Sequence, residues 1–149
     1  MMLHPLLFLH ITSVVIWVGG MFFAYFCLKP AAAQLLEPSQ RLPLWVATFS
    51  RFFKLTAAAV VTILATGFMM LMQVGMKNAP MGWHIMLSTG LLMALVFVYV
   101  YAVLYPRLCK QCDAATWPAA GATLNTIRKM VGLNLLLSVI TIAAATFAR

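Results

Sequence analysis

The chain has 149 residues, 64% of them hydrophobic, and sets only two acidic residues against ten Lys and Arg. This composition excludes a soluble globular domain and indicates a membrane protein. The net charge of +8 would suit nucleic acid, but the basic residues fall between apolar runs and not on one face. We therefore expect membrane lipid around the chain and no nucleic-acid partner.

Four uncharged runs are long enough to cross about 30 Å of hydrocarbon. They are Pro5–Leu28, Leu55–Met76, Asn78–Pro106 and Met130–Ala148. Prolines, glycines and the loop-like stretches 35–43 and 112–121 then predict helices over about 5–28, 45–74, 80–105 and 123–147. Because the connections are short, we expect an all-α protein with one transmembrane domain, 1–149, folded as a four-helix up-and-down bundle.

The first run is too long for a signal peptide and follows no basic stretch, so we expect it to remain as a permanent span. Basic residues gather in the first and third connections, whereas the second has only Lys77. The clustered residues are Lys29, Arg41, Arg51, Lys54, Arg107, Lys110, Arg128 and Lys129. By the positive-inside rule these two connections face the cytoplasm, and both termini face the periplasmic side.

Two histidines interrupt the first and third runs. His10 lies five residues after Pro5, and His84 lies four residues after Pro80. At about 1.5 Å rise per residue, both sit roughly 6–8 Å inside their helices, which run in the same direction and are diagonal partners in the bundle. A b-type haem needs such a pair of imidazoles, and this predicts His10 and His84 as ligands of haem iron. The open alternative is that each histidine hydrogen-bonds a neighbouring helix.

Polar and aromatic residues share the faces of these histidines. Ser13 and Trp17 follow His10 at i+3 and i+7, and Ser88 follows His84 at i+4, so we expect these three to contact the cofactor. The second and fourth helices carry polar stripes that should face the bundle interior. These stripes contain Thr62, Thr66, Met69 or Met70, Gln73, Asn134, Ser138 and Thr141.

Methionines offer a second ligand set. The chain has eleven, and Met69, Met72 and Met76 follow one another at i, i+3 and i+7 near His84. Thioethers and imidazole together suit Cu(I), which makes this group the alternative metal site. Ordinary packing also explains methionines in apolar helices. The pair Cys109 and Cys112 forms one C-x-x-C, which we expect to be reduced thiols.

Several stretches resemble a known family. They are "LHITSVVIWVGGMFF", "FSRFFKLTAAAVVTILATGF", "GWHIMLSTGLLM" and "WPAAGATLNTIRKMVGLNLLLSVIT". The pattern LHxxxxxxWxGG at Leu9–Gly20 and the SRF at Ser50–Phe52 are the most specific. Together they resemble the CopD-domain (copper resistance protein D) family of bacterial inner-membrane proteins, in the form of a small four-helix member. The resemblance implies a multi-pass protein of the bacterial inner membrane.

The same helix pattern has a more distant similarity to HemJ-type membrane proteins, which are linked to protoporphyrinogen oxidation and to haem b. By position, this similarity implies that His10 is the first-helix ligand and His84 its third-helix counterpart. The chain departs from the HemJ type in having Lys29-Pro30 where that type has Pro-Arg. It also has apolar residues at 85–87 where that type has a lysine.

The leading hypothesis is therefore a b-type haem protein with bis-histidine ligation, acting in electron transfer or haem handling. Such a protein is a membrane oxidoreductase candidate whose partner is a quinone or another redox protein. The alternative is a Cu(I)-binding or copper-transport protein that uses Met69, Met72, Met76 and His84. A further alternative is an assembly subunit without a cofactor. A homo-oligomer remains open.

Overall fold

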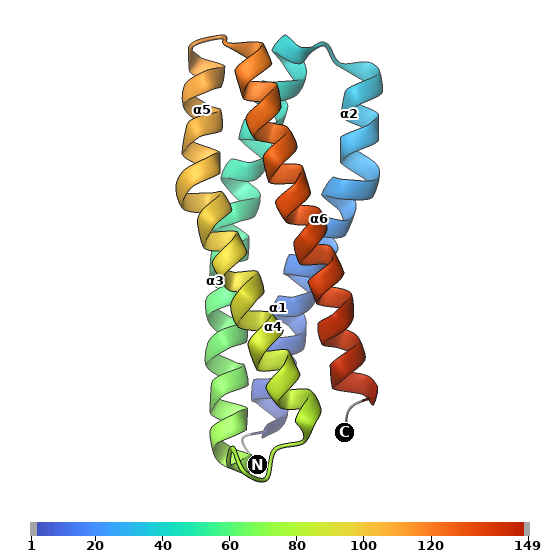
Figure 1. Cartoon of the computed structure of the whole chain (residues 1–149), viewed down its shortest axis with the longest axis vertical. Coiled ribbons are helices and arrows are strands. Elements are labelled where there is room, and N and C mark those ends of the chain that lie inside the picture. Colours follow the sequence, from blue (N-terminus) through green and yellow to red (C-terminus); the bar gives the residue numbers. More distant parts are fainter. Residues whose placement is uncertain (1–2, 148–149) are drawn as a thin grey trace.

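The computed structural model describes residues 3–147, and these form four long helices (Figure 1). Each is apolar and long enough to cross a membrane, and no strand occurs between residues 3 and 147. The expected all-α, four-helix up-and-down membrane bundle is confirmed. Its elements are α1 (Leu3–Phe23), a π-helical segment (Ala24–Leu28), α2 (Lys29–Leu35), α3 (Pro38–Val74), α4 (Met81–Tyr99), a second π-helical segment (Val100–Leu104), α5 (Tyr105–Asp113) and α6 (Trp117–Phe147).

The bundle consists of two helical hairpins laid against each other. α1 packs mainly along α3, and α4 packs mainly along α6. The first described residue, the last one and the turn between α3 and α4 lie at the lower end of Figure 1. We call this the histidine end, because His10 and His84 lie in its half of the bundle. The connections from α2 to α3 and from α5 to α6 lie at the other end, which we call the basic end.

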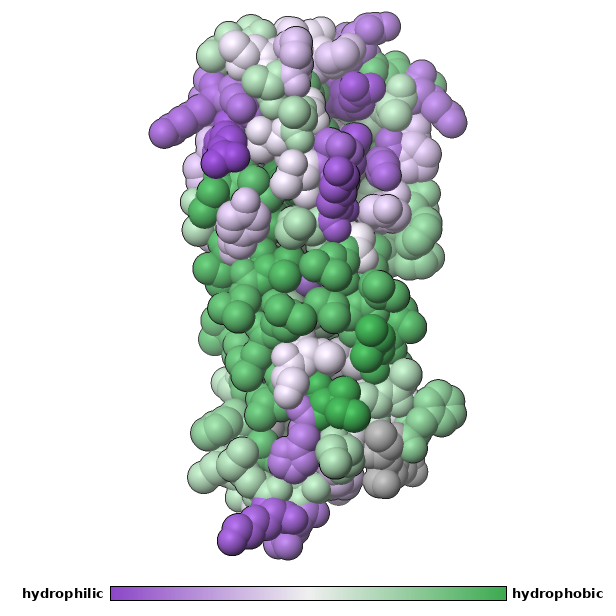
Figure 2. Space-filling view, in the orientation of Figure 1, coloured by the Kyte–Doolittle hydropathy of each residue, from purple (hydrophilic) through white to green (hydrophobic). Residues whose placement is uncertain are grey.

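The sides of the bundle present apolar side chains outward. Figure 2 shows a hydrophobic band around the middle of the molecule, with hydrophilic residues gathered toward the two ends. Phe8, Val15, Leu95 and Val139 are among the large apolar side chains exposed on this surface. An apolar surface of this extent is stable only against lipid, so the bundle contacts membrane lipid along its sides.

Two prolines lie inside transmembrane helices, and this changes the helix ends expected from the sequence. We predicted that the first helix ends at 28 and the third at 105, yet the helical path continues to Leu35 and Asp113. A π-helical segment precedes each proline. The amide of Lys29 donates to the carbonyl of Ala24, and that of Tyr105 donates to Val100, five residues back in both cases. This wider turn makes room for the rings of Pro30 and Pro106, so the helix bends without ending.

Prolines also explain why α3 and α6 begin earlier than the expected residues 45 and 123. Pro38 is the first residue of α3 and Pro118 the second of α6, positions where the missing N–H is not needed. Pro43 lies just beyond the first turn of α3. The stretch that the sequence predicts as a loop is therefore helical apart from a short break at Leu36–Glu37.

The basic half of the bundle is filled with aromatic rings. Trp45, Phe49 and Phe53 follow each other along α3 with ring centroids 5.2 and 4.7 Å apart. Phe53 also packs edge-on against Phe97 and Tyr105. Rings in this arrangement contribute beyond their buried area, so this half of the molecule is a solid core.

Candidate functional site

The histidine half of the bundle contains a cavity of about 660 Å³. All four long helices line it, mostly with aliphatic and aromatic side chains. Trp17 and Met93, both buried, line it toward the aromatic core, where Trp17 meets Phe97 across the bundle at 6.2 Å between ring centroids. A cavity of this size is within the range of small-molecule sites in proteins. The polar groups on its wall therefore decide its chemistry.

His10 is the one titratable side chain on that wall within residues 3–147. Its Nδ1 lies 2.9 Å from the Thr66 hydroxyl of α3. That hydroxyl has a single proton, and it lies 2.6 Å from the carbonyl oxygen of Thr62, to which it donates. The hydroxyl oxygen is thus left to accept from His10. The hydrogen-bond network assigns the proton to Nδ1 and the free lone pair to Nε2.

His10 thus hydrogen-bonds a neighbouring helix, as the open alternative expected, and metal-binding histidines use the same arrangement. A ligating imidazole usually donates its second N–H to a neighbouring acceptor, which fixes the tautomer and the ring plane. In this chain Thr66 is the acceptor, and Nε2 is the nitrogen able to bind a metal. Both residues are held on helices that pack closely together, so the imidazole is oriented before any ligand arrives.

A glycine makes room for the imidazole. A methyl group added at Gly67 would lie 3.3 Å from Cε1 of His10 and 3.7 Å from its Nδ1. Any side chain at this position therefore presses on the ring that Thr66 orients. Gly67 follows Thr66 directly on α3. Thr66 accepts the hydrogen bond from His10, and Gly67 leaves room for the imidazole ring.

Three methionines line the same cavity as His10. Met70 comes from α3, and Met86 and Met93 come from α4. Met70 and Met93 are buried, and Met86 is half-buried. Thioether sulfur and neutral imidazole nitrogen are soft and borderline donors that select Cu(I) over hard cations. The donors on the cavity wall are therefore of the chemical types that copper(I) prefers.

Only some of the residues predicted to hold haem line the cavity. His10 and Trp17 line the cavity, whereas His84 does not. His84 is half-buried, and its neighbour Trp83 is the residue that faces the cavity. Ser13 is buried outside the cavity wall, and Ser88 is exposed, with its hydroxyl donating to the carbonyl of His84. The structure does not bring His10 and His84 to opposite sides of one cavity.

The residues predicted for the copper alternative lie on the outside of the bundle. Met69, Met72 and Met76 are 44%, 60% and 52% exposed, and none of them lines the cavity. Met76 lies in the turn beyond α3. Cys27, Cys109 and Cys112 are free thiols. Between residues 3 and 147 no three His, Cys, Asp or Glu side chains gather as a metal-binding group.

The sequence predicted some of the residues at this cavity but not others. Thr66 and Met70 belonged to the polar stripe expected to face inward, but neither was connected to His10. Met86 belonged to the methionines gathered near the turn, but it was not connected to His10, and Met93 had no signal of its own because the second half of α4 is apolar on every side. Their spacing of seven residues, two helical turns, places both on one face and is the pattern that could have identified them.

Comparisons with known proteins give one family. The family model described as "Copper resistance protein D" matches residues 46–148, more than half of the chain. The match covers most of α3 and all the elements after it, and it leaves α1 with His10 outside. No curated protein and no solved structure matches the chain. None of these comparisons supports the more distant HemJ similarity.

Proposed function

Because the chain belongs to the copper resistance protein D family, we propose that it binds copper(I) as its cargo within the membrane. One observation carries this proposal: His10, Met70, Met86 and Met93 all line a single cavity inside the bundle. An ionisable side chain such as His10 is rare inside a membrane bundle without a function. The family points to copper, and the donor set on the cavity wall is one that copper(I) prefers.

The protein's own residues divide the task. His10 supplies a neutral nitrogen whose direction is set by Thr66, and the three methionines supply sulfur from two other helices, α3 and α4. The remaining lining is largely apolar, which keeps water from competing for the ion. A single positive charge in such surroundings needs direct ligation, because its hydration is lost.

We further propose that the basic end faces the cytoplasm in a bacterial inner membrane. The positive-inside rule supports this orientation, since the basic residues cluster at that end and Lys77 alone lies in the turn at the histidine end. Both termini and the cavity would then lie toward the periplasm. Copper would enter or leave the cavity from that side.

The experiment compares two sets of methionines in protein purified in mild detergent. Copper(I) affinity is measured by competition with a chromogenic chelator under reducing, anaerobic conditions. One variant carries Met70→Leu, Met86→Leu and Met93→Leu, and its matched control carries Met69→Leu, Met72→Leu and Met76→Leu. His10→Ala is compared with His84→Ala in the same way.

The proposal expects the inner triple variant and His10→Ala to lose copper(I) binding by at least about tenfold each, or about 1.4 kcal/mol. The triple variant at Met69, Met72 and Met76 and the variant His84→Ala should bind copper(I) as tightly as the parent does. If only the triple variant at Met69, Met72 and Met76 and the variant His84→Ala lost copper(I) binding, these four residues would be the ligands instead. Unchanged binding in every variant would remove copper from the cavity and favour an assembly subunit without a cofactor.

Haem b is the second candidate, and the size of the cavity favours it. A volume of about 660 Å³ exceeds what one metal ion occupies and suits a larger ligand. His10 would then be one axial ligand, and a quinone or another redox protein would exchange electrons with the chain. An absorption spectrum before and after dithionite reduction separates the candidates: a Soret band that disappears in His10→Ala supports haem, and a colourless protein with bound copper removes it.

A further inference from the structure

The basic end contains buried nitrogen donors that have no acceptor. Within residues 3–147, Arg41 Nε, Trp45 Nε1, and both Nε and Nη2 of Arg128 are buried without a hydrogen-bond partner. Trp45 is only 2% exposed. A buried donor left unpaired costs about 1–3 kcal/mol, and more when it is charged. Four such donors at one end of a helical bundle require an explanation.

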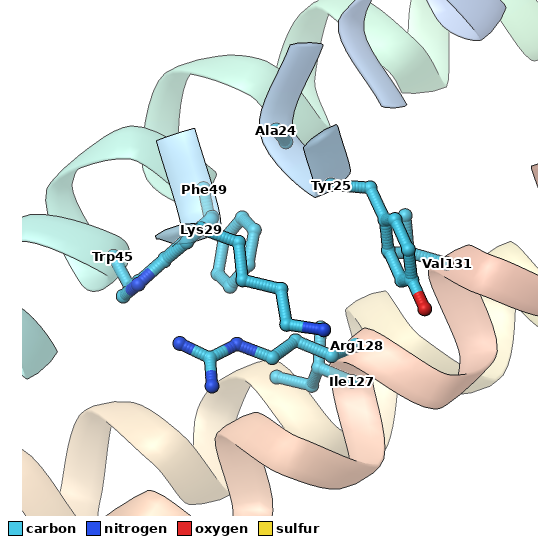
Figure 3. A pocket seen from close by; sticks show the side chains of 8 residues that line it. All are labelled: Ala24, Tyr25, Lys29, Trp45, Phe49, Ile127, Arg128 and Val131. Atoms are coloured by element: carbon cyan, nitrogen blue, oxygen red, sulfur yellow. The ribbon is translucent and has the colours of Figure 1, made fainter. Parts of the chain in front are cut away.

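Three cations converge there. Lys29, Arg41 and Arg128 are all half-buried, and Arg41 is close enough to Arg128 for their charges to repel. Two of the cations rest on aromatic rings: Lys29 Nζ lies 4.5 Å from the centre of the Tyr25 ring, and Arg128 Cζ lies 5.5 Å from the Trp45 ring. Figure 3 shows Lys29 and Arg128 reaching into the same opening. The rings offset part of the charge, but they do not replace a counterion.

The opening is a small hollow between the first helix, α3 and α6. Its walls beside the cations and rings are apolar, formed by Ala24, Phe49, Ile127 and Val131. It has room for about 10 Å³, which is close to one oxygen-sized atom. The hollow can therefore receive one oxygen of an anionic group.

The hollow also lies where the uncharged runs end. Lys29 directly follows the run Pro5–Leu28, and Arg128 and Lys129 directly precede the run that starts at Met130. These positions place the cations at the level of the lipid headgroups, with apolar helix surface next to them. Basic pockets between transmembrane helices at this level bind phosphate-bearing headgroups.

We propose that this cluster binds the phosphate group of an anionic phospholipid in the leaflet at the basic end. A phosphoryl oxygen in the hollow accepts from the unpaired nitrogens of Trp45 and Arg128, which line it, and the negative charge relieves the repulsion between Arg128 and Arg41. Guanidinium matches phosphate in geometry and charge. A lipid suits this place because its acyl chains can lie along the exposed apolar sides of the bundle while a phosphoryl oxygen enters the hollow.

The test is native mass spectrometry of delipidated protein in detergent, titrated with dioleoyl phosphatidylglycerol or dioleoyl phosphatidylcholine. The variants are Arg128→Met, Arg128→Lys and Lys29→Met. Arg51→Met is the matched control, because Arg51 is exposed on α3 and does not line the hollow. Circular dichroism verifies that each variant keeps its helix content. Inorganic phosphate, at matched ionic strength, is the competing probe.

The parent should bind phosphatidylglycerol about tenfold or more tightly than phosphatidylcholine, and Arg128→Met should remove about tenfold of that affinity. Arg128→Lys should show an intermediate loss, and Arg51→Met should stay within about twofold of the parent. Equal losses in Arg51→Met, or no preference for the anionic lipid, would overturn the site. If inorganic phosphate displaced the lipid, the site would be one for free phosphate and not for a lipid headgroup. None of these readouts depends on copper.

Discussion

The hydrogen bond between His10 and Thr66 makes a quantitative prediction for Thr66→Val. Valine keeps the branched shape of threonine but removes the hydroxyl that lies 2.9 Å from Nδ1 of His10. For Nε2 to bind a metal, the proton must stay on Nδ1, which then has lost its acceptor inside a half-buried site. An unpaired buried N–H costs about 1–3 kcal/mol. Loss of an outer partner of a metal-bound histidine typically weakens affinity by about 10- to 100-fold.

These two estimates agree, since a loss of 10- to 100-fold corresponds to about 1.4–2.7 kcal/mol. We therefore expect Thr66→Val to weaken copper(I) binding by about that factor in the chelator competition assay. Thr66→Ser, which keeps the hydroxyl, should restore most of the affinity. Thr62→Val is the matched control, because the Thr62 hydroxyl donates only to the carbonyl of Ala58, at 2.8 Å.

Two results would refute the reasoning. If Thr66→Val bound copper(I) as well as the parent while His10→Ala did not, the hydroxyl would have no part in orienting the imidazole. If Thr62→Val lost as much affinity as Thr66→Val, the effect would belong to α3 as a whole and not to the bond with His10.

Three further predictions concern packing, two at glycines and one in the aromatic core. Gly20→Ala brings a methyl group into the ring of Phe52 and should lower thermal stability by about 1 kcal/mol, seen as a lower Tm in detergent; Gly19→Ala, with nothing within 4 Å, should leave the Tm unchanged or slightly higher. Gly67→Ala should weaken copper(I) binding without lowering the Tm, because it favours the helix but presses on His10; a parallel loss of both would contradict this. Phe53→Ala removes a ring that is 2% exposed and should cost about 3–5 kcal/mol, measured by chemical unfolding; a change below about 1 kcal/mol would mean that the aromatic core is not rigid.

The sequence predicted the number of helices and their alternating direction, because length and hydrophobicity determine these features. It did not predict which face of each helix turns inward. α3 places Met70 in the cavity and Met69 in lipid, and α4 places Trp83 in the cavity and His84 outside it. Neighbouring residues differ by about 100° around a helix. A helix that is apolar on all sides gives no signal strong enough to choose between them.

Two of the helix ends differ from those expected because a proline does not end these helices. The expected ends at 28 and 105 treat Pro30 and Pro106 as helix terminators, although each is preceded by a π-helical segment that lets the helix continue. The sequence contains the prolines but no separate signal for the extra residue in the preceding turn. In contrast, Gly75 ends α3 with φ of 85°, a conformation that favours glycine and that the sequence indicates well.

The two π-helical segments divide the four transmembrane helices into two kinds. α3 and α6 have no π-helical segment, whereas the first and third helices each contain one, and the segment of the third helix lies within the aromatic core. A segment of this kind lacks one regular backbone bond at the proline, so bending costs less there than elsewhere. The first and third helices therefore bend most easily at these two segments. Amide hydrogen exchange should be faster in Ala24–Leu28 and Val100–Leu104 than in α3 at the same depth, and equal rates would exclude such hinges.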